Sequence, residues 1–214
     1  MQYKIILFDL DGTLIDPQLG ITSAVQYALA MMGINEDREM LTPFIGPPLP
    51  VSFKKFYNFN EKKAMEAVGY YREYYLPKGM YESTVYRGIP ELLTKLKKNK
   101  DKLYIVTSKP TVVAEKVVKY HDLFDYFEKV IGSKADLSDA DKTTLVSYAL
   151  KLHPNEKKES FVMLGDREHD IIGAQANGID SIGLTFGFGS HEEIKNANPT
   201  HIVQSIKELS QILL

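Results

Sequence analysis

The feature that most constrains this chain is an apolar run that ends in two carboxylates. Ile5 to Phe8 predicts a short strand buried on both faces, and Asp9 and Asp11 follow it closely. Side chains two residues apart on a strand point the same way, so both carboxylates are expected to converge just beyond the strand's carboxyl end. Gly12 then permits a sharp change of backbone direction. Ligands bind at this edge of open α/β sheets, which makes the stretch a candidate site.

Two carboxylates held this close repel each other unless something offsets their charge. A divalent cation is one solution. A raised pKa is another, because it leaves a protonated acid beside an ionised nucleophile. The alternative interpretation is structural, a strand end with exposed acids that leads into a turn, since Asp and Gly are common turn residues.

The remainder of the chain alternates apolar runs with helical segments. The apolar runs predict strands at 103–106, 129–133, 160–164, 181–186 and 201–203. The predicted helices include 111–120, 138–152, 167–177 and a C-terminal helix capped by Ser205 and Glu208. The helix at 138–152 is expected to open with a capping box at Ser138 to Asp141. This alternation indicates an α/β fold, a Rossmann-like parallel sheet with helices on both faces.

A helical insertion interrupts the alternation directly after the first strand. Residues 18–32, 51–57 and 61–75 have helical periodicity. The chain is therefore expected to divide into an α/β core domain, 1–15 with 86–214, and an all-helical cap domain, 16–85. Because the insertion follows the candidate site in sequence, the cap is expected to act as a lid over the carboxyl edge of the sheet.

Composition narrows the class of partners. The net charge of −2 argues against binding a nucleic-acid polymer through bulk positive charge. The chain has no cysteine, which excludes disulfides and thiolate chemistry, and no apolar run long enough to span a bilayer. The 5 histidines show no paired helical spacing, which argues against zinc. We therefore expect a cytoplasmic monomer or homodimer with no membrane partner.

Polar side chains suited to phosphate chemistry also end two further predicted strands. Thr107 and Ser108 follow one strand, and Asp166 follows another. Strands of one parallel sheet present their carboxyl ends at one edge, so these residues are expected to meet Asp9 and Asp11 in space. The coincidence across three strands is stronger evidence for a site than any single motif.

Together these motifs resemble those of the haloacid dehalogenase superfamily, over nearly the whole chain. Asp9-Leu10-Asp11-Gly12-Thr13 is similar to the first motif, and Thr107 to the second. Lys142, near a predicted helix start, resembles the third, with Lys134 as a competing candidate. Gly165-Asp166 followed by Asp170 resembles the fourth, and the insertion resembles the superfamily's C1 cap.

Two further segments are similar to parts of the phosphoglycolate phosphatase and 5′-nucleotidase branch, namely Gly46-Pro47-Pro48-Leu49 and Gly187-Phe188-Gly189. The resemblance implies a Mg²⁺-dependent phosphatase in which Asp9 forms an aspartyl-phosphate and Asp11 gives and later takes a proton. It implies that Asp9, Asp166 and the backbone carbonyl of Asp11 hold Mg²⁺. The residues expected to bind the phosphoryl group are Asp9, Gly12, Thr107, Ser108 and Lys142, with Thr13 and Asp170 in supporting positions.

The expected function is hydrolysis of a small phosphorylated metabolite, either phosphoglycolate or a nucleoside 5′-monophosphate. Gly46, Pro47 and Lys54 in the cap are candidate substrate contacts. Two alternatives share the core residues. One is a phosphomutase similar to β-phosphoglucomutase, which must shield the phosphoenzyme from water. The other is a non-catalytic phosphate-binding module.

Overall fold

The chain folds as two compact units. The computed structural model describes residues 3–214. One unit comprises the residues up to Asp16 together with Val85–Leu214, and the other comprises Pro17–Thr84. The second unit is therefore an insertion in the sequence of the first.

The first unit is built on a six-stranded parallel sheet with the strand order β5-β4-β1-β6-β7-β8. The strands are β1 (Ile5–Phe8), β4 (Lys102–Pro110), β5 (Lys129–Ser133), β6 (Phe161–Gly165), β7 (Asp180–Leu184) and β8 (His201–Val203). All four residues of β1 are buried, as expected for a strand covered on both faces. The predicted fold class is confirmed.

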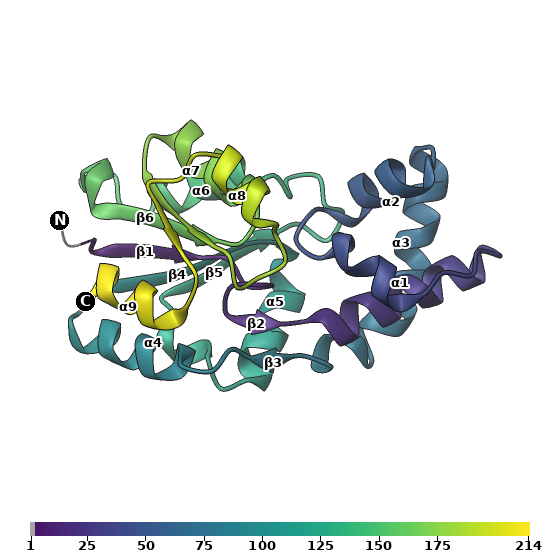
Figure 1. The fold of residues 1–214 in the computed structure, drawn as a ribbon, viewed down its shortest axis with the longest axis horizontal. Helices are drawn as coiled ribbons and strands as arrows, with labels where there is room; N and C mark the ends of the chain where they lie inside the picture. The colour runs from purple at the N-terminus through teal and green to yellow at the C-terminus, as the bar shows by residue number, and fades with distance from the viewer. Residues whose placement is uncertain (1–2) are drawn as a thin grey trace. The chain divides into compact units, whose positions relative to one another are not determined.

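Helices cover both faces of this sheet (Figure 1). One face carries α4 (Ile89–Lys98), α5 (Thr111–Tyr120) and α9 (Ile206–Leu213), and the other carries α6 (Lys142–Lys151), α7 (Glu168–Asn177) and α8 (His191–Asn196). Successive side chains of β1 point to opposite faces of the sheet. Ile5 and Leu7 join the cluster that includes Val146 of α6, whereas Phe8 packs edge-on against Phe127. Burying such side chains stabilises the fold by about 1.5–3 kcal/mol each.

Several elements differ from the expectation. A second, two-stranded sheet pairs β2 (Ile15–Asp16) with β3 (Thr84–Val85), and short 3₁₀ helices occur at Phe124–Tyr126 and Lys158–Ser160. The prediction of a helix from Ser138 is wrong, because α6 begins at Lys142 and its N-cap is Asp141, which accepts a hydrogen bond from the Thr144 amide. The predicted cap of the C-terminal helix is confirmed, since Ser205 accepts from the amide of Glu208.

The second unit contains α1 (Gln18–Met31), α2 (Leu49–Tyr57) and α3 (Glu61–Tyr75), with 3₁₀ helices at Arg38–Phe44 and Gly79–Tyr81. Its interior is rich in aromatic rings, including the stacked pair Tyr71 and Tyr75 and an edge-on contact between Phe44 and Phe53. Within the residues described, the structure has no helix that is both long and apolar enough to cross a membrane.

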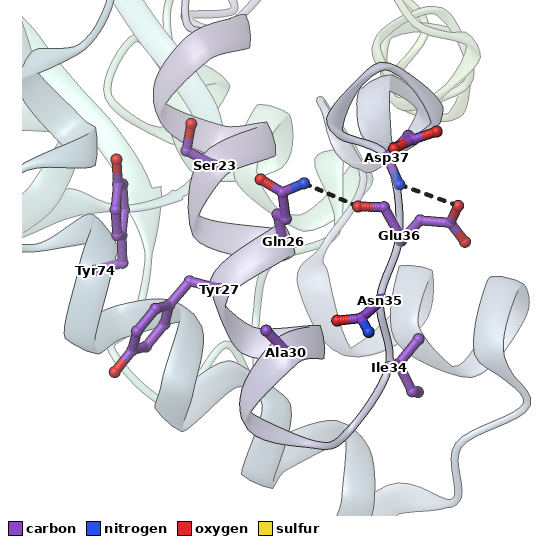
Figure 2. A pocket seen from close by; sticks show the side chains of 9 residues that line it. All are labelled: Ser23, Gln26, Tyr27, Ala30, Ile34, Asn35, Glu36, Asp37 and Tyr74. Atoms are coloured by element: carbon purple, nitrogen blue, oxygen red, sulfur yellow. Dashed lines mark hydrogen bonds between the residues drawn. The ribbon is translucent and has the colours of Figure 1, made fainter.

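A groove of about 710 Å³ runs along α1 in this unit (Figure 2). Its walls include Tyr27 and Tyr74, whose ring centroids are 6.0 Å apart, and the segment 34–37. The Gln26 side chain donates to the Glu36 carbonyl, and the Asp37 amide donates to Glu36 Oε1. The Glu36 carboxylate also accepts from Tyr57. The polar groups along this wall therefore bind one another.

Candidate active site

The site residues gather where three adjacent strands end. In the sheet, β1 lies between β4 and β6, and Phe8 is aligned with Ile105 on one side and Leu164 on the other. The Asp9 amide continues the ladder by donating to the Leu164 carbonyl. The chain thus delivers a group of buried polar side chains to this edge: Asp9, Asp11, Thr13, Thr107, Lys142, Asp166 and Asp170.

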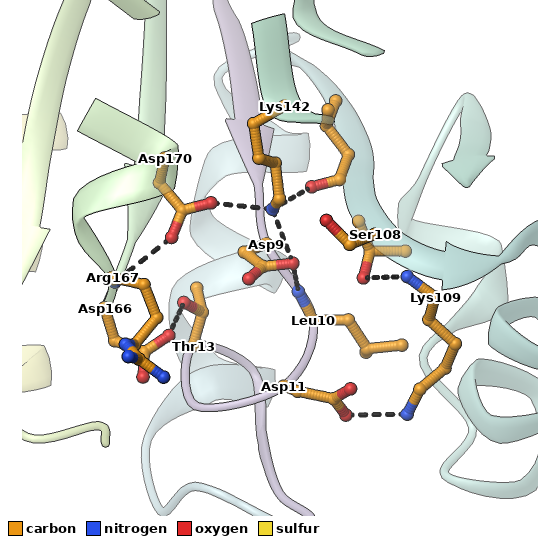
Figure 3. Close-up of polar contacts among 12 residues, drawn as sticks. Asp9, Leu10, Asp11, Thr13, Ser108, Lys109, Lys142, Asp166, Arg167 and Asp170 are labelled. Carbon is orange, nitrogen blue, oxygen red and sulfur yellow. Dashed lines mark hydrogen bonds and ion pairs between the residues drawn. The ribbon is translucent and has the colours of Figure 1, made fainter. Parts of the chain in front are cut away.

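Three of the carboxylates form a compact group (Figure 3). Asp9, Asp166 and Asp170 each place one carboxylate oxygen within 4.8 Å of the others. Lys142 Nζ lies 2.8 Å from Asp9 Oδ1 and 2.6 Å from Asp170 Oδ1, and it donates to the Val106 carbonyl. The exposed Lys134 instead lies 3.7 Å from Asp139. Of the two candidate lysines, the structure brings Lys142 to the carboxylates.

Burial sets the protonation of this group. It raises the pKa of Asp166 well above the ordinary value, and the carboxylates of Asp170 and Asp9 add to the effect. Burial also raises the pKa of Asp170 to about 6, against the opposing effect of Lys142. For Lys142, burial alone would lower the pKa, but Asp170 and Asp9 outweigh it and the pKa is raised. The carboxylates therefore carry an unfavourable charge that a cation would offset.

The residues present fit a divalent cation. The site contains four buried carboxyl groups, of which Lys142 pairs with those of Asp9 and Asp170, Lys109 pairs with that of Asp11, and the fourth belongs to Asp166. Hard cations such as Mg²⁺ prefer oxygen ligands, and carboxylates with an excess of negative charge supply them. Asp170 belongs to this acidic group, whereas the Asp11 side chain is paired with Lys109.

Glycines make room for these carboxylates. A Cβ atom on Gly12 would overlap the carboxylate of Asp166, and a Cβ on Gly165 would overlap that of Asp170. Gly12 also has a φ of +79°, a conformation that side chains disfavour. Gly187 likewise packs directly on Asp166. The backbone therefore surrounds the acidic group at distances that only glycine allows.

Lys109 is a site residue that the sequence interpretation missed. Its Nζ lies 2.8 Å from Asp11 Oδ1, and both side chains are buried. Burial raises the pKa of Asp11, while Lys109 opposes that shift. The structure places Lys109 in the site because β4 extends to Pro110 and its pairing register with β5 shifts between Thr107 and Pro110. Such a bulge re-aims a side chain at a sheet edge.

Hydrogen bonds of side chains on β4 and β5 fix the bulge. Ser108 Oγ donates to the Ala140 carbonyl, and Ser133 Oγ donates to the Ser108 carbonyl. Thr107 Oγ1 accepts from the Lys109 amide at 3.3 Å. Ser108, expected to bind phosphate, thus uses its hydroxyl proton in a structural hydrogen bond.

The remaining candidates occupy defined positions. The Gly12 amide donates to the Ile15 carbonyl, and Thr13 Oγ1 lies 3.5 Å from Asp166 Oδ1. Gly46 and Pro47 lie in the loop before α2, and Lys54 of α2 pairs with Glu61 at 2.6 Å. These last three residues belong to the second unit, so their contact with a substrate remains a prediction.

The raised carboxyl pKa values predict an unusual pH dependence of stability. A carboxyl group whose native pKa exceeds its unfolded value destabilises the fold when ionised, so the free energy of unfolding rises as the pH falls through the native pKa. The native pKa of Asp170 is about 6. From this group we expect the free energy of unfolding of the metal-free protein in EDTA, measured with urea, to rise by on the order of 1 kcal/mol between pH 7 and pH 5. Asp170→Asn should reduce this dependence and leave the part that comes from Asp166, and saturating Mg²⁺ should also reduce it. A steady loss of stability over this range would contradict the assignment.

With the geometry established, the relatives of the chain become informative. Residues 6–184 match the haloacid dehalogenase-like hydrolase family. The chain belongs to this family. A 5′-nucleotidase of Pseudomonas aeruginosa is 43% identical over 214 residues, which span 100% of this chain and 96% of that protein. A crystal structure of a predicted phosphatase from Clostridium acetobutylicum has a TM-score of 0.95 and 45% identity, covering 99% of this chain and 98% of the other.

Two further relatives of the haloacid dehalogenase-like chain are more distant. The tyrosine-protein kinase PtkA of Mycobacterium tuberculosis is 32% identical, and the aligned region covers 98% of this chain and 72% of PtkA. A phosphoglycolate phosphatase of Vibrio parahaemolyticus is 28% identical over 98% of this chain and 96% of its own length. The family predicted from the motifs is confirmed. The prediction that the chain is an enzyme of the hydrolase class is confirmed as well. Both branches that the sequence resembles occur among these relatives.

Proposed function

We propose that this chain is a Mg²⁺-dependent phosphomonoester hydrolase that acts through an aspartyl-phosphate on Asp9. The observation that carries the proposal is the convergence of Asp9, Asp166, Asp170 and Lys142 in one buried group, with Asp11 beside it. Relatives named as phosphatases support the same reaction class.

Asp9, Asp166 and the backbone carbonyl of Asp11 would hold Mg²⁺, with Asp170 close enough to contribute. When bound, Mg²⁺ supplies charge that offsets the repulsion between the Asp9 carboxylate and a phosphomonoester dianion. The excess of carboxylates over ammonium groups supports this assignment.

The residues of the chain account for the two chemical steps. In the first, a carboxylate oxygen of Asp9 forms a bond to phosphorus while the ester P–O bond breaks, and Asp11 gives its proton to the departing alkoxide. In the second, Asp11 takes a proton from water, whose oxygen attacks phosphorus and releases inorganic phosphate with Asp9 restored. Lys142 and Thr107 would stabilise the charge on the transferring phosphoryl oxygens. The contact with Lys109 would orient the Asp11 carboxyl group.

We propose that the substrate is a small phosphorylated metabolite. We assign recognition of its leaving group to the helical unit Pro17–Thr84. The 5′-nucleotidase relative favours a nucleoside 5′-monophosphate, and the phosphoglycolate phosphatase relative makes phosphoglycolate the second candidate. The absence of cysteine is consistent with a cytoplasmic enzyme. The proposal includes that the enzyme is a monomer or a homodimer.

The experiment that tests the proposal is phosphate release from a panel of phosphomonoesters. The panel contains nucleoside 5′-monophosphates, phosphoglycolate, sugar phosphates and an aryl phosphate. We expect sustained turnover with Mg²⁺ and a loss of activity in EDTA that added Mg²⁺ restores, because the dianion and Asp9 otherwise repel each other. Isomerised sugar phosphate without phosphate release would indicate the phosphomutase. Binding of phosphate esters without turnover would indicate the non-catalytic module.

A further inference from the structure

We propose that Glu193, which lies on α8 and hydrogen-bonds to Arg167 and Glu168, is a positioning residue for the metal-binding carboxylates of Asp166 and Asp170. The inference rests on the proposed Mg²⁺-dependent function. It concerns the segment between Asp166 and Asp170, which joins β6 to α7.

Glu193 holds this segment from one side. Its Oε1 accepts from Arg167 Nε at 2.8 Å and from the Glu168 amide at 3.0 Å. Arg167 and Glu168 directly follow Asp166 in sequence, and Asp170 comes two residues later. Glu168 is the first residue of α7, so Glu193 satisfies an amide at the helix start that no helical carbonyl can reach. A single carboxylate oxygen therefore anchors the connection between two candidate metal ligands.

The loop that leads into α8 lies on the other side of Asp166. Ser190, the N-cap of α8, accepts from the Glu193 backbone amide, and the Phe188 amide donates to Asp166 Oδ2 at 2.7 Å. Gly189 packs so closely on the Asp166 backbone that a Cβ atom there would overlap the Asp166 carbonyl. The position of α8 therefore determines where the loop presents its amide to Asp166. By tying α8 to the segment that follows Asp166, the Glu193 side chain links the two segments that flank this carboxylate.

Groups that orient metal ligands affect metal affinity as well as structure. Loss of such an outer contact typically weakens metal binding by about 10–100-fold. If Glu193 acts only as a cap for α7, its removal lowers the free energy of unfolding but leaves Mg²⁺ affinity unchanged. The affinity measured without substrate therefore separates the two roles.

The test is calorimetric titration of Mg²⁺ into substrate-free protein, using the wild type, Glu193→Ala, Glu193→Gln and the matched control Glu192→Gln. Glu192 is the preceding residue on α8 and is exposed. We expect the Mg²⁺ dissociation constant to rise by about 10–100-fold in Glu193→Ala, by a smaller factor in Glu193→Gln, and not at all in Glu192→Gln.

A dissociation constant within twofold of the wild type in folded Glu193→Ala overturns the inference. If that variant does not fold by circular dichroism, Glu193→Gln decides, and an unchanged affinity there overturns the inference equally. Failure of the proposed function looks different, because then the wild type itself does not release phosphate, whatever its Mg²⁺ affinity.

Discussion

Replacing Asp9 by Asn is expected to abolish phosphate release on every substrate while leaving the protein folded. The change removes the proposed nucleophile, and loss of a covalent nucleophile typically costs on the order of 10⁴-fold or more in kcat. The amide side chain retains the size of the carboxylate and an oxygen that can accept from the Leu10 amide and Lys142, which now contact Asp9 Oδ1. Lys142 also keeps its partner Asp170, so no buried ammonium is left unpaired.

The measurement is steady-state phosphate release with Mg²⁺, together with urea unfolding of both proteins. Asp122→Asn is the matched control, since Asp122 is exposed and has a positive φ that Asn tolerates. We expect the control to keep wild-type activity. Appreciable turnover by purified Asp9→Asn would eliminate the aspartyl-phosphate pathway, and acid quenching of the wild type during turnover should trap phosphate on the protein.

The parts of the site that were predictable from sequence are those fixed by strand ends. Asp9 and Asp166 end central strands whose apolar residues have no other plausible location, so their place at the sheet edge follows from burial alone. Asp170 lies near the start of the helix that follows β6, and that placement follows from the same pattern. The sequence also predicted the insertion after the first strand, because the strand–helix alternation stops there.

The parts that were not predictable depend on local hydrogen bonds that compete with regular structure. The segment before α6 looked like a helix start, but Asp136 accepts from the Ser138 amide and Asp139 accepts from the Lys134 amide. Such side-chain bonds hold the backbone in turns and delay the helix to Lys142. Lys142, the lysine preferred from the sequence, is the first residue of α6 and lies against Asp9 and Asp170, whereas Lys134 lies near Asp139.

Lys109 was hidden for a similar reason. Alternation from Thr107 would place Lys109 on the same face, but the strand expected from the sequence ended at residue 106, and the bulge that sets the position of Lys109 depends on Ser133, which is distant in sequence. Gly132 contributes as well, because a Cβ there would overlap the Lys109 carbonyl. Close packing between β4 and β5 therefore determines the position of this ammonium group, and a pattern read along one strand cannot reveal it.

Replacing Lys142 by Met is expected to destabilise the protein more than any other single change at the site. Lys142 Nζ is the ammonium between Asp9 and Asp170, and its removal leaves buried carboxylates facing one another. Breaking a buried ion pair from one side typically costs about 3–5 kcal/mol, because the remaining charge is uncompensated. We expect a loss of this size in EDTA at pH 7 by urea unfolding, and a fall in kcat on the order of 10²–10³-fold with Mg²⁺.

The conditions that restore the stability of the Lys142→Met variant identify the cause of its destabilisation. Without the ammonium, the pKa of Asp170 should rise further, so acidification toward pH 5 should recover stability by protonating this carboxylate in the native state. Saturating Mg²⁺ should also recover stability, because it binds the native carboxylates. Lys134→Met is the matched control: Lys134 is exposed, so its loss should change stability by no more than about 0.5 kcal/mol and leave activity intact. If Lys142→Met is equally unstable in EDTA and in Mg²⁺ and at both pH values, the loss comes from packing of the lysine side chain and not from removal of its charge.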